Sequence, residues 1–248
     1  MSRSPRDLYL DLLIKTLTNM IYGDSSTNPT NAGAFRSELR EVGYDWPAVA
    51  HTMVGKRRLE NVRDLAQRAI DEEIPGHFIE TGVWRGGCCI LMRGVLAANS
   101  VKDRKVYAAD SFEGVPPPQP ELYPEDEGFD LDLFHELAVS LDNVKANFAC
   151  YDLLDDQVVF IKGLFHDTLP TLDAGPFALI RLDGDLYQST YVALEALYPK
   201  LSPGGFVIID DFNLLIPVKE AVTRFREING IARRMHPVDW NAIWWQNT

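Results

Sequence analysis

The sequence is poor in cysteine and in long apolar runs, and each shortage excludes a class of protein. Three cysteines in 248 residues, two of them adjacent at Cys88 and Cys89, do not form a disulfide framework, so a reducing cytoplasm is expected. Met1 to Arg6 contains no apolar signal core. No uncharged run approaches the roughly 20 residues that a membrane span requires. The sequence therefore predicts a cytoplasmic protein that does not associate with membranes.

Basic residues are also scarce relative to acidic ones. The chain has 36 acidic and 24 basic residues and a formal net charge of −12. Binding along a nucleic-acid backbone needs lysines and arginines clustered on one face, so no nucleic-acid partner is expected. The length and the 46% content of hydrophobic residues fit one well-buried α/β domain.

Apolar runs and amphipathic segments alternate after a helical front end. Residues 1–75 are expected to form a helical extension of the same domain, and residues 76–248 the main core. Helices are predicted at 8–22, 35–42, 56–72, 87–99, 131–148, 189–200 and 218–228. Strands are predicted at 77–80, 106–109, 158–161, 177–182 and 206–209, followed by an antiparallel hairpin at 232–236 and 242–245. This alternation predicts a parallel sheet with helices on both faces.

Four aspartates follow two of the most apolar predicted strands. Asp183 and Asp185 come after the run at 177–182, and Asp210 and Asp211 come after the run at 206–209. Ligands of such sheets bind beyond the carboxyl ends of the strands, and carboxylates there suit a hard cation such as Mg²⁺. The alternative is that these acids cap the helices that follow.

A glycine turn follows the first predicted strand. Gly82, Gly86 and Gly87 lie between that strand and a helix, with Glu80 just before them. The spacing differs from the G-x-G-x-x-G of NAD-binding proteins, which disfavours a dehydrogenase. A second acid, Asp110, follows the next strand, where Rossmann-type folds bind a ribose diol. Two acids without a phosphate cradle point to S-adenosylmethionine, although glycines at such turns are also common for structural reasons.

A proline-rich and acidic segment covers residues 115–132. It contains Pro116, Pro117, Pro118 and Pro120, followed by the acidic residues Glu121, Glu125, Asp126, Glu127 and Asp130. A loop of this length in a compact domain is usually functional or disordered. It is interpreted as a lid over the site, with an inert solvated loop as the alternative.

Several motifs together resemble macrocin O-methyltransferases, a family that includes enzymes methylating sugars of macrolides and aminocoumarins. The resemblance covers nearly the whole chain. It is carried by the sequences LYLDLL at 8–13, HTMVG at 51–55, ETGVWRGG at 80–87, ADSF at 109–112, LDGD at 182–185 and LSPGG at 201–205 leading to Asp210 and Asp211. It implies a class I S-adenosylmethionine-dependent fold: a Rossmann-like, mostly parallel seven-stranded sheet with a C-terminal antiparallel hairpin.

The resemblance also implies S-adenosylmethionine as methyl donor, Mg²⁺ as metal and a role for each matching residue. Asp183, Asp210 and Asp211 would bind the metal, and Asp185 would be the general base. The residues implied for the donor are Glu80, Gly82, Gly86 and Gly87 at the methionine end, Asp110 and Ser111 at the ribose, Thr52 and Met53 closing over it, and Asp156 and Gln157 near the adenine. Leu164 and His166 depart from relatives, which carry Trp and Lys there, and this leaves the acceptor in doubt.

The expected partner is a small-molecule glycoside or nucleotide sugar. A catechol-type aromatic O-methyltransferase and a non-catalytic S-adenosylmethionine-binding protein are the alternatives. The wide apolar face of the helix predicted at 8–22 suggests a homo-oligomer, unless this helix packs on its own subunit.

Overall fold

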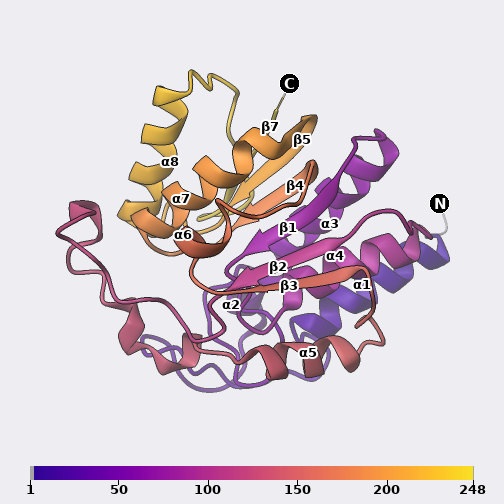
Figure 1. The fold of residues 1–248 in the computed structure, drawn as a ribbon. Helices are drawn as coiled ribbons and strands as arrows, with labels where there is room; N and C mark the ends of the chain where they lie inside the picture. The colour runs from indigo at the N-terminus through magenta and orange to yellow at the C-terminus, as the bar shows by residue number, and fades with distance from the viewer. Residues whose placement is uncertain (1–2, 248) are drawn as a thin grey trace.

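A seven-stranded sheet in the order β3-β2-β1-β4-β5-β7-β6 forms the centre of the computed structural model, which describes residues 3–247 (Figure 1). Strands β1 to β5 are parallel, whereas β7 is antiparallel to both β5 and β6. The strands are β1 His77–Thr81, β2 Val106–Asp110, β3 Val158–Lys162, β4 Phe177–Leu182, β5 Leu201–Ile209, β6 His236–Pro237 and β7 Ile243–Gln246. The predicted class of fold, with its C-terminal hairpin, is confirmed.

Helices cover both faces of the sheet because alternate residues of the central strands are apolar on both sides. The helices are α1 Pro5–Leu17, α2 Ser37–Glu41, α3 Gly55–Asp71, α4 Gly87–Ala98, α5 Leu141–Ala149, α6 Phe165–Thr168, α7 Tyr187–Leu197 and α8 Ile216–Ile228 (Figure 1). Phe78 contributes to the core under α1, α3, α4 and α5, and its neighbour Ile79 to the core under α7 and α8. Within residues 3–247, none of these helices combines the length and apolarity needed to span a bilayer.

The N-terminal helices pack on the main sheet domain. In α1, Leu10, Leu13, Ile14 and Leu17 are buried in the same core as residues of α3, α4 and β1. The boundary proposed between residues 75 and 76 falls in the turn between α3 and β1. The buried face of α1 therefore stabilises its own subunit.

Several boundary predictions are wrong, including the helix predicted at 8–22 and the strand predicted at 206–209, and two others have a clear physical reason. The helix predicted at 131–148 begins only at Leu141, because Ser140 accepts a hydrogen bond from the backbone N–H of Asn143 and caps it there. The preceding residues form two separate 3₁₀ turns, Leu131–Leu133 and His135–Leu137. The strand predicted at 232–236 is reduced to His236–Pro237, and Pro237 has no N–H to extend the ladder.

Two leucines of α1 provide a matched test of this packing. Leu17 is fully buried, whereas Leu12 is 56% exposed. Leu17→Ala should lower the free energy of unfolding by about 2–5 kcal/mol, because it removes buried methyl groups and leaves a cavity. At a protein concentration low enough to dissociate any oligomer, Leu12→Ala should change it by less than about 0.5 kcal/mol. Urea unfolding of both variants measures the difference, and equal effects would contradict this placement of α1.

Candidate active site

A pocket lies at the carboxyl ends of the central strands, where parallel sheets bind ligands. Glu80, Asp110 and Asp183 come from β1, β2 and the loop after β4, and all three line it. Thr52, Met53 and Ser111 also line the pocket, so these residues predicted to contact the donor are brought together with the acids.

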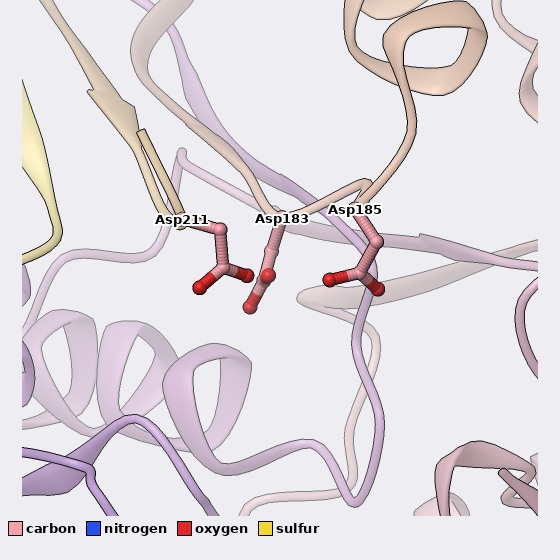
Figure 2. Close-up of side chains that lie close together, drawn as sticks. All are labelled: Asp183, Asp185 and Asp211. Carbon is pink, nitrogen blue, oxygen red and sulfur yellow. The ribbon is translucent and has the colours of Figure 1, made fainter. Parts of the chain in front are cut away.

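Three aspartates form a carboxylate cluster in the wall of this pocket. Asp183, Asp185 and Asp211 each present an oxygen, and these oxygens lie within 4.8 Å of one another (Figure 2). Asp185 and Asp211 have positive φ angles of 61° and 53°, which non-glycine residues rarely adopt. Such strain is tolerated mainly where the surrounding structure holds a functional residue in place.

Burial and mutual repulsion perturb the pKa values of these acids. Burial, together with the charge of Asp183, raises the pKa of Asp185 to about 7. Burial and the charges of Asp210 and Asp185 raise the pKa of Asp211 to about 8. Like charges at this distance disfavour the ionised state, and a cation between them reverses that effect. Carboxylates held this close together with repelling charges suit a hard divalent cation, which Asp183 and Asp211 could hold with Asp185 beside it.

Asp210, the fourth acid, is neutralised by arginines instead. It pairs with Arg58 at 2.5 Å and with Arg181, whose guanidinium also contacts Glu80 at 2.6 Å and Asp183 at 3.0 Å. Burial raises the pKa of Asp210, but the two guanidiniums outweigh it and lower the pKa below its usual value. The predicted metal ligands are thus divided: Asp183 and Asp211 lie in the cluster with the predicted base, and Asp210 lies behind it in an ion-pair network.

The sequence analysis missed two side chains that hold these acids. Arg58 of α3 is 5% exposed and bridges Asp210 to Asp239. Asp239 lies in the turn between β6 and β7, and the Nε of Arg58 donates to its carboxylate at 2.8 Å. From the same turn, the side-chain amide of Asn241 donates to Asp211 at 2.6 Å. An arginine beside Leu59, on the apolar face of an amphipathic helix, is a signal that could have identified Arg58, because an unpaired buried charge is costly.

The two acids predicted to contact the donor already have protein partners. Glu80 pairs with Arg181 and accepts a hydrogen bond from the Cys89 thiol at 2.8 Å. Asp110 accepts from the backbone N–H groups of Val83 at 2.6 Å and Phe112 at 2.7 Å. Burial raises the pKa of both acids. Both remain in the pocket wall, but part of their role is to fix the turn after β1.

The glycines of that turn are required by contacts within the protein. A Cβ at Gly82 would lie 1.6 Å from the carbonyl oxygen of Asp183, and one at Gly87 would lie 2.5 Å from that of His51. Gly82 and Gly87 line the pocket, whereas a Cβ at Gly86 would face Val144 and Phe148 of α5. These glycines allow neighbouring loops to approach the site closely.

The assignment of Asp156 and Gln157 to the adenine is not supported by their position. Both residues precede β3, at the amino end of the sheet, whereas the pocket lies at the carboxyl end. The Gln157 amide donates to the carbonyl oxygens of Val101 and Arg104 and so ties β3 to the loop before β2. Beyond the other end of β3, a run of four residues lines the pocket: Gly163, Leu164, Phe165 and His166.

The proline-rich segment contributes to the pocket. Val115, Pro116 and Gln119 line it, as do Leu131 and Leu137 further along. The segment therefore forms part of the pocket wall, and its role as a lid stays a prediction. His166, whose ring is 40% exposed, lies near the acidic side chain of Asp167 and not in the carboxylate cluster.

Comparison with known proteins gives a consistent result. Residues 6–247 match the family model described as macrocin O-methyltransferase. The chain belongs to this family. It is 46% identical over 251 residues to demethyldecarbamoylnovobiocin O-methyltransferase of Streptomyces niveus, covering 100% of this chain and 96% of that protein. It is 44% identical to mycinamicin III 3''-O-methyltransferase of Micromonospora griseorubida, covering 98% and 97% of the two chains.

The solved structures agree with the sequence relatives. The O-methyltransferase NovP superimposes with a TM-score of 0.95 at 47% identity, over 98% of this chain and 99% of that one. The calicheamicin methyltransferase CalS11 has a TM-score of 0.61 at 20% identity over 99% and 94%, and this likeness shows the fold alone. This member of the macrocin O-methyltransferase family is a methyltransferase with the class I fold.

The raised pKa of Asp185 predicts a pH dependence of stability. The folded state binds this proton more tightly than the unfolded chain, in which the pKa is near 3.8. The free energy of unfolding should therefore fall as the pH rises from about 4 to about 7. In chelator, Tm should be lower at about pH 8 than at about pH 5, and Asp185→Asn should show a smaller difference. An unchanged difference in the variant would contradict the raised pKa.

Proposed function

We propose that this methyltransferase transfers a methyl group from S-adenosylmethionine to a sugar hydroxyl of a glycosylated natural product or nucleotide sugar, with Mg²⁺. The observation that supports this most directly is the carboxylate cluster of Asp183, Asp185 and Asp211 in the same pocket as the turn after β1. By their names, the two relatives given above methylate demethyldecarbamoylnovobiocin and the 3'' position of mycinamicin III.

The donor is assigned to the side of the pocket formed after β1 and β2. Glu80 provides negative charge near the methionine end, where the donor carries an ammonium and a sulfonium, and Asp110 with Ser111 provides acceptors for ribose hydroxyls. Thr52 and Met53 form the wall contributed by the N-terminal helical region. The acidic lining suits this cationic donor better than a dinucleotide diphosphate.

Activation of the acceptor is assigned to the cluster. An aliphatic hydroxyl is a poor nucleophile, and an aspartate with an ordinary pKa of about 3.9 is too weak a base to deprotonate it. Without metal, burial raises the pKa of Asp185 to about 7. Bound Mg²⁺ would lower the proton affinity of Asp185, but it would also lower that of the hydroxyl, so the carboxylate can still take the proton. Asp185 therefore accepts the hydroxyl proton at a carboxylate oxygen.

Asp183 and Asp211 would hold the metal, with Asp210 as the third acid of the proposed set. When bound, Mg²⁺ would orient the acceptor hydroxyl and stabilise the negative charge that develops on its oxygen. Asn241 and Arg58 orient Asp211 and Asp210, respectively, from the protein side. The segment at 115–132 lines the pocket with Val115, Pro116, Gln119 and Leu131, and as a lid it would keep donor and acceptor close together.

Removal of the metal should abolish turnover and leave donor binding largely intact. Chelator-treated protein should regain activity with Mg²⁺, and calorimetry without acceptor should give a similar donor dissociation constant in both states. Methylation of a panel of deoxysugar glycosides, nucleotide sugars and catechols measures turnover and identifies the acceptor class. Full activity in excess chelator would refute the metal, and turnover of catechols alone would refute the sugar acceptor.

Two isosteric variants separate the base from a metal ligand. Asp185→Asn should reduce kcat by about 10²–10⁴-fold with little change in metal affinity, because Asn cannot accept the proton. Asp183→Asn should instead raise the metal concentration needed for half-maximal rate. Steady-state kinetics over a Mg²⁺ titration measures both. Near-normal kcat of Asp185→Asn at saturating Mg²⁺ would exclude Asp185 as the base.

We also propose that the outward face of α1 mediates self-association. Leu8 and Leu12 are 53% and 56% exposed, on the side opposite the buried residues of α1, and Tyr9 at the edge of this face is 39% exposed. Leu8→Asp combined with Leu12→Asp should lower the sedimentation coefficient by dissociating the oligomer, because charged groups are disfavoured in an apolar interface. An oligomeric state equal to that of the unchanged protein would reject this interface.

A further inference from the structure

The proline-rich segment contains one deeply buried carboxylate, that of Asp126. It lies in a 3₁₀ turn, Pro124–Asp126, and is 0% exposed, although the next acid, Glu127, is exposed. Its Oδ1 accepts a hydrogen bond from the backbone N–H of Tyr187 at 2.6 Å, and its Oδ2 accepts from that of Gln188 at 3.1 Å.

These two N–H groups begin α7. The first N–H groups of a helix have no partner within the helix and are usually bound by a side chain just before it. Here the preceding residue is Leu186, which has no acceptor side chain, and Asp185 belongs to the carboxylate cluster. Asp126, about 60 residues earlier in the chain, supplies both acceptors and a negative charge that the helix dipole favours.

The start of α7 is directly connected to the loop that holds the candidate base. Leu186 donates its N–H to the carbonyl oxygen of Gly184 at 2.6 Å. A Cβ at Gly184 would lie 3.1 Å from the Cβ of Ser189, so the loop rests against the first turn of the helix. Asp185, whose φ is 61°, lies between Gly184 and Leu186, and these contacts hold both neighbours in place. A shift of the first turn would therefore shift Asp185.

The same turn also anchors the wall of the pocket. Residues on both sides of Asp126, Gln119 before it and Leu131 after it, line the pocket. The rings of Tyr123 and Tyr187 lie with centroids 6.2 Å apart beside the anchor. The 3₁₀ turn thus contacts both α7 and α8 while its flanking residues face the site.

We propose that Asp126 is a positioning residue that joins the acceptor side of the pocket to the loop carrying Asp185. Asp126 binds the N–H groups of Tyr187 and Gln188. It thereby fixes the position of the proline-rich wall relative to the carboxylate of Asp185, which takes the proton. The kinetic consequence rests on the proposed function, whereas the anchoring of residues 183–188 does not.

Asp126→Asn tests the anchor with minimal change of shape. Asn offers one acceptor oxygen, and its NH₂ group would face the second backbone N–H, so one of the two bonds is lost. Amide hydrogen exchange at residues 185–188 should become about tenfold faster, the typical effect of losing a helix cap. Glu127→Gln is the matched control, because it removes one charge from an exposed neighbour and should leave this exchange unchanged.

Kinetics test the consequence for the site. Asp126→Asn should lower kcat/KM for the acceptor about tenfold relative to Glu127→Gln, with the donor dissociation constant unchanged because Glu80 and Asp110 lie at other strand ends. Unchanged exchange at 185–188 would overturn the anchor. If Asp126→Asn shows faster exchange at 185–188 but the same kcat/KM as Glu127→Gln, the positioning role is overturned. If the protein without substitutions is inactive on every sugar acceptor, the proposed function is refuted. Amide hydrogen exchange at 185–188 would still show whether Asp126 anchors α7.

Discussion

The guanidinium of Arg181 is the group on which the geometry of the site depends. It is 1% exposed and contacts Glu80, Asp183 and Asp210, three acids from three segments that meet at the carboxyl end of the sheet. The register of β1 and β4 places Glu80 directly beside Arg181, so strand pairing itself forms the first of these ion pairs. Removing one partner of a buried ion pair typically costs about 3–5 kcal/mol, because the other charge is left uncompensated.

The positive charge is distributed unevenly among the acids, and this gives them different chemistry. Asp210 has two arginine partners and a lowered pKa, which favours its ionised form as part of the framework. Asp185 and Asp211 have each other and the remaining acids as neighbours, and their pKa values are raised to about 7 and about 8. The same buried region therefore contains a structural carboxylate and carboxylates that can exchange protons or bind a cation.

Distant segments of the chain complete the site. Arg58 reaches Asp210 from the N-terminal helical region, and Asn241 reaches Asp211 from the turn between β6 and β7. Asp126 holds the first turn of α7 from within the proline-rich segment. The N-terminal helices and the C-terminal hairpin are accordingly parts of the site as well as coverings of the sheet.

The sequence by itself determined the class of fold and the location of the site. Apolar runs ended by acids are local patterns, and in a parallel sheet all such ends meet at one edge, which is why Asp183, Asp185 and Asp211 could be expected together. Tertiary structure decided which acid is neutralised: Asp210 and Asp211 are adjacent, but only packing of α3 against β5 brings Arg58 to the first of them. It also placed Asp156 and Gln157 at the opposite end of the sheet and gave Asp126 its role at α7. These outcomes depend on contacts between residues far apart in the chain, and a hydrophobic pattern read along the sequence carries no information about such distances.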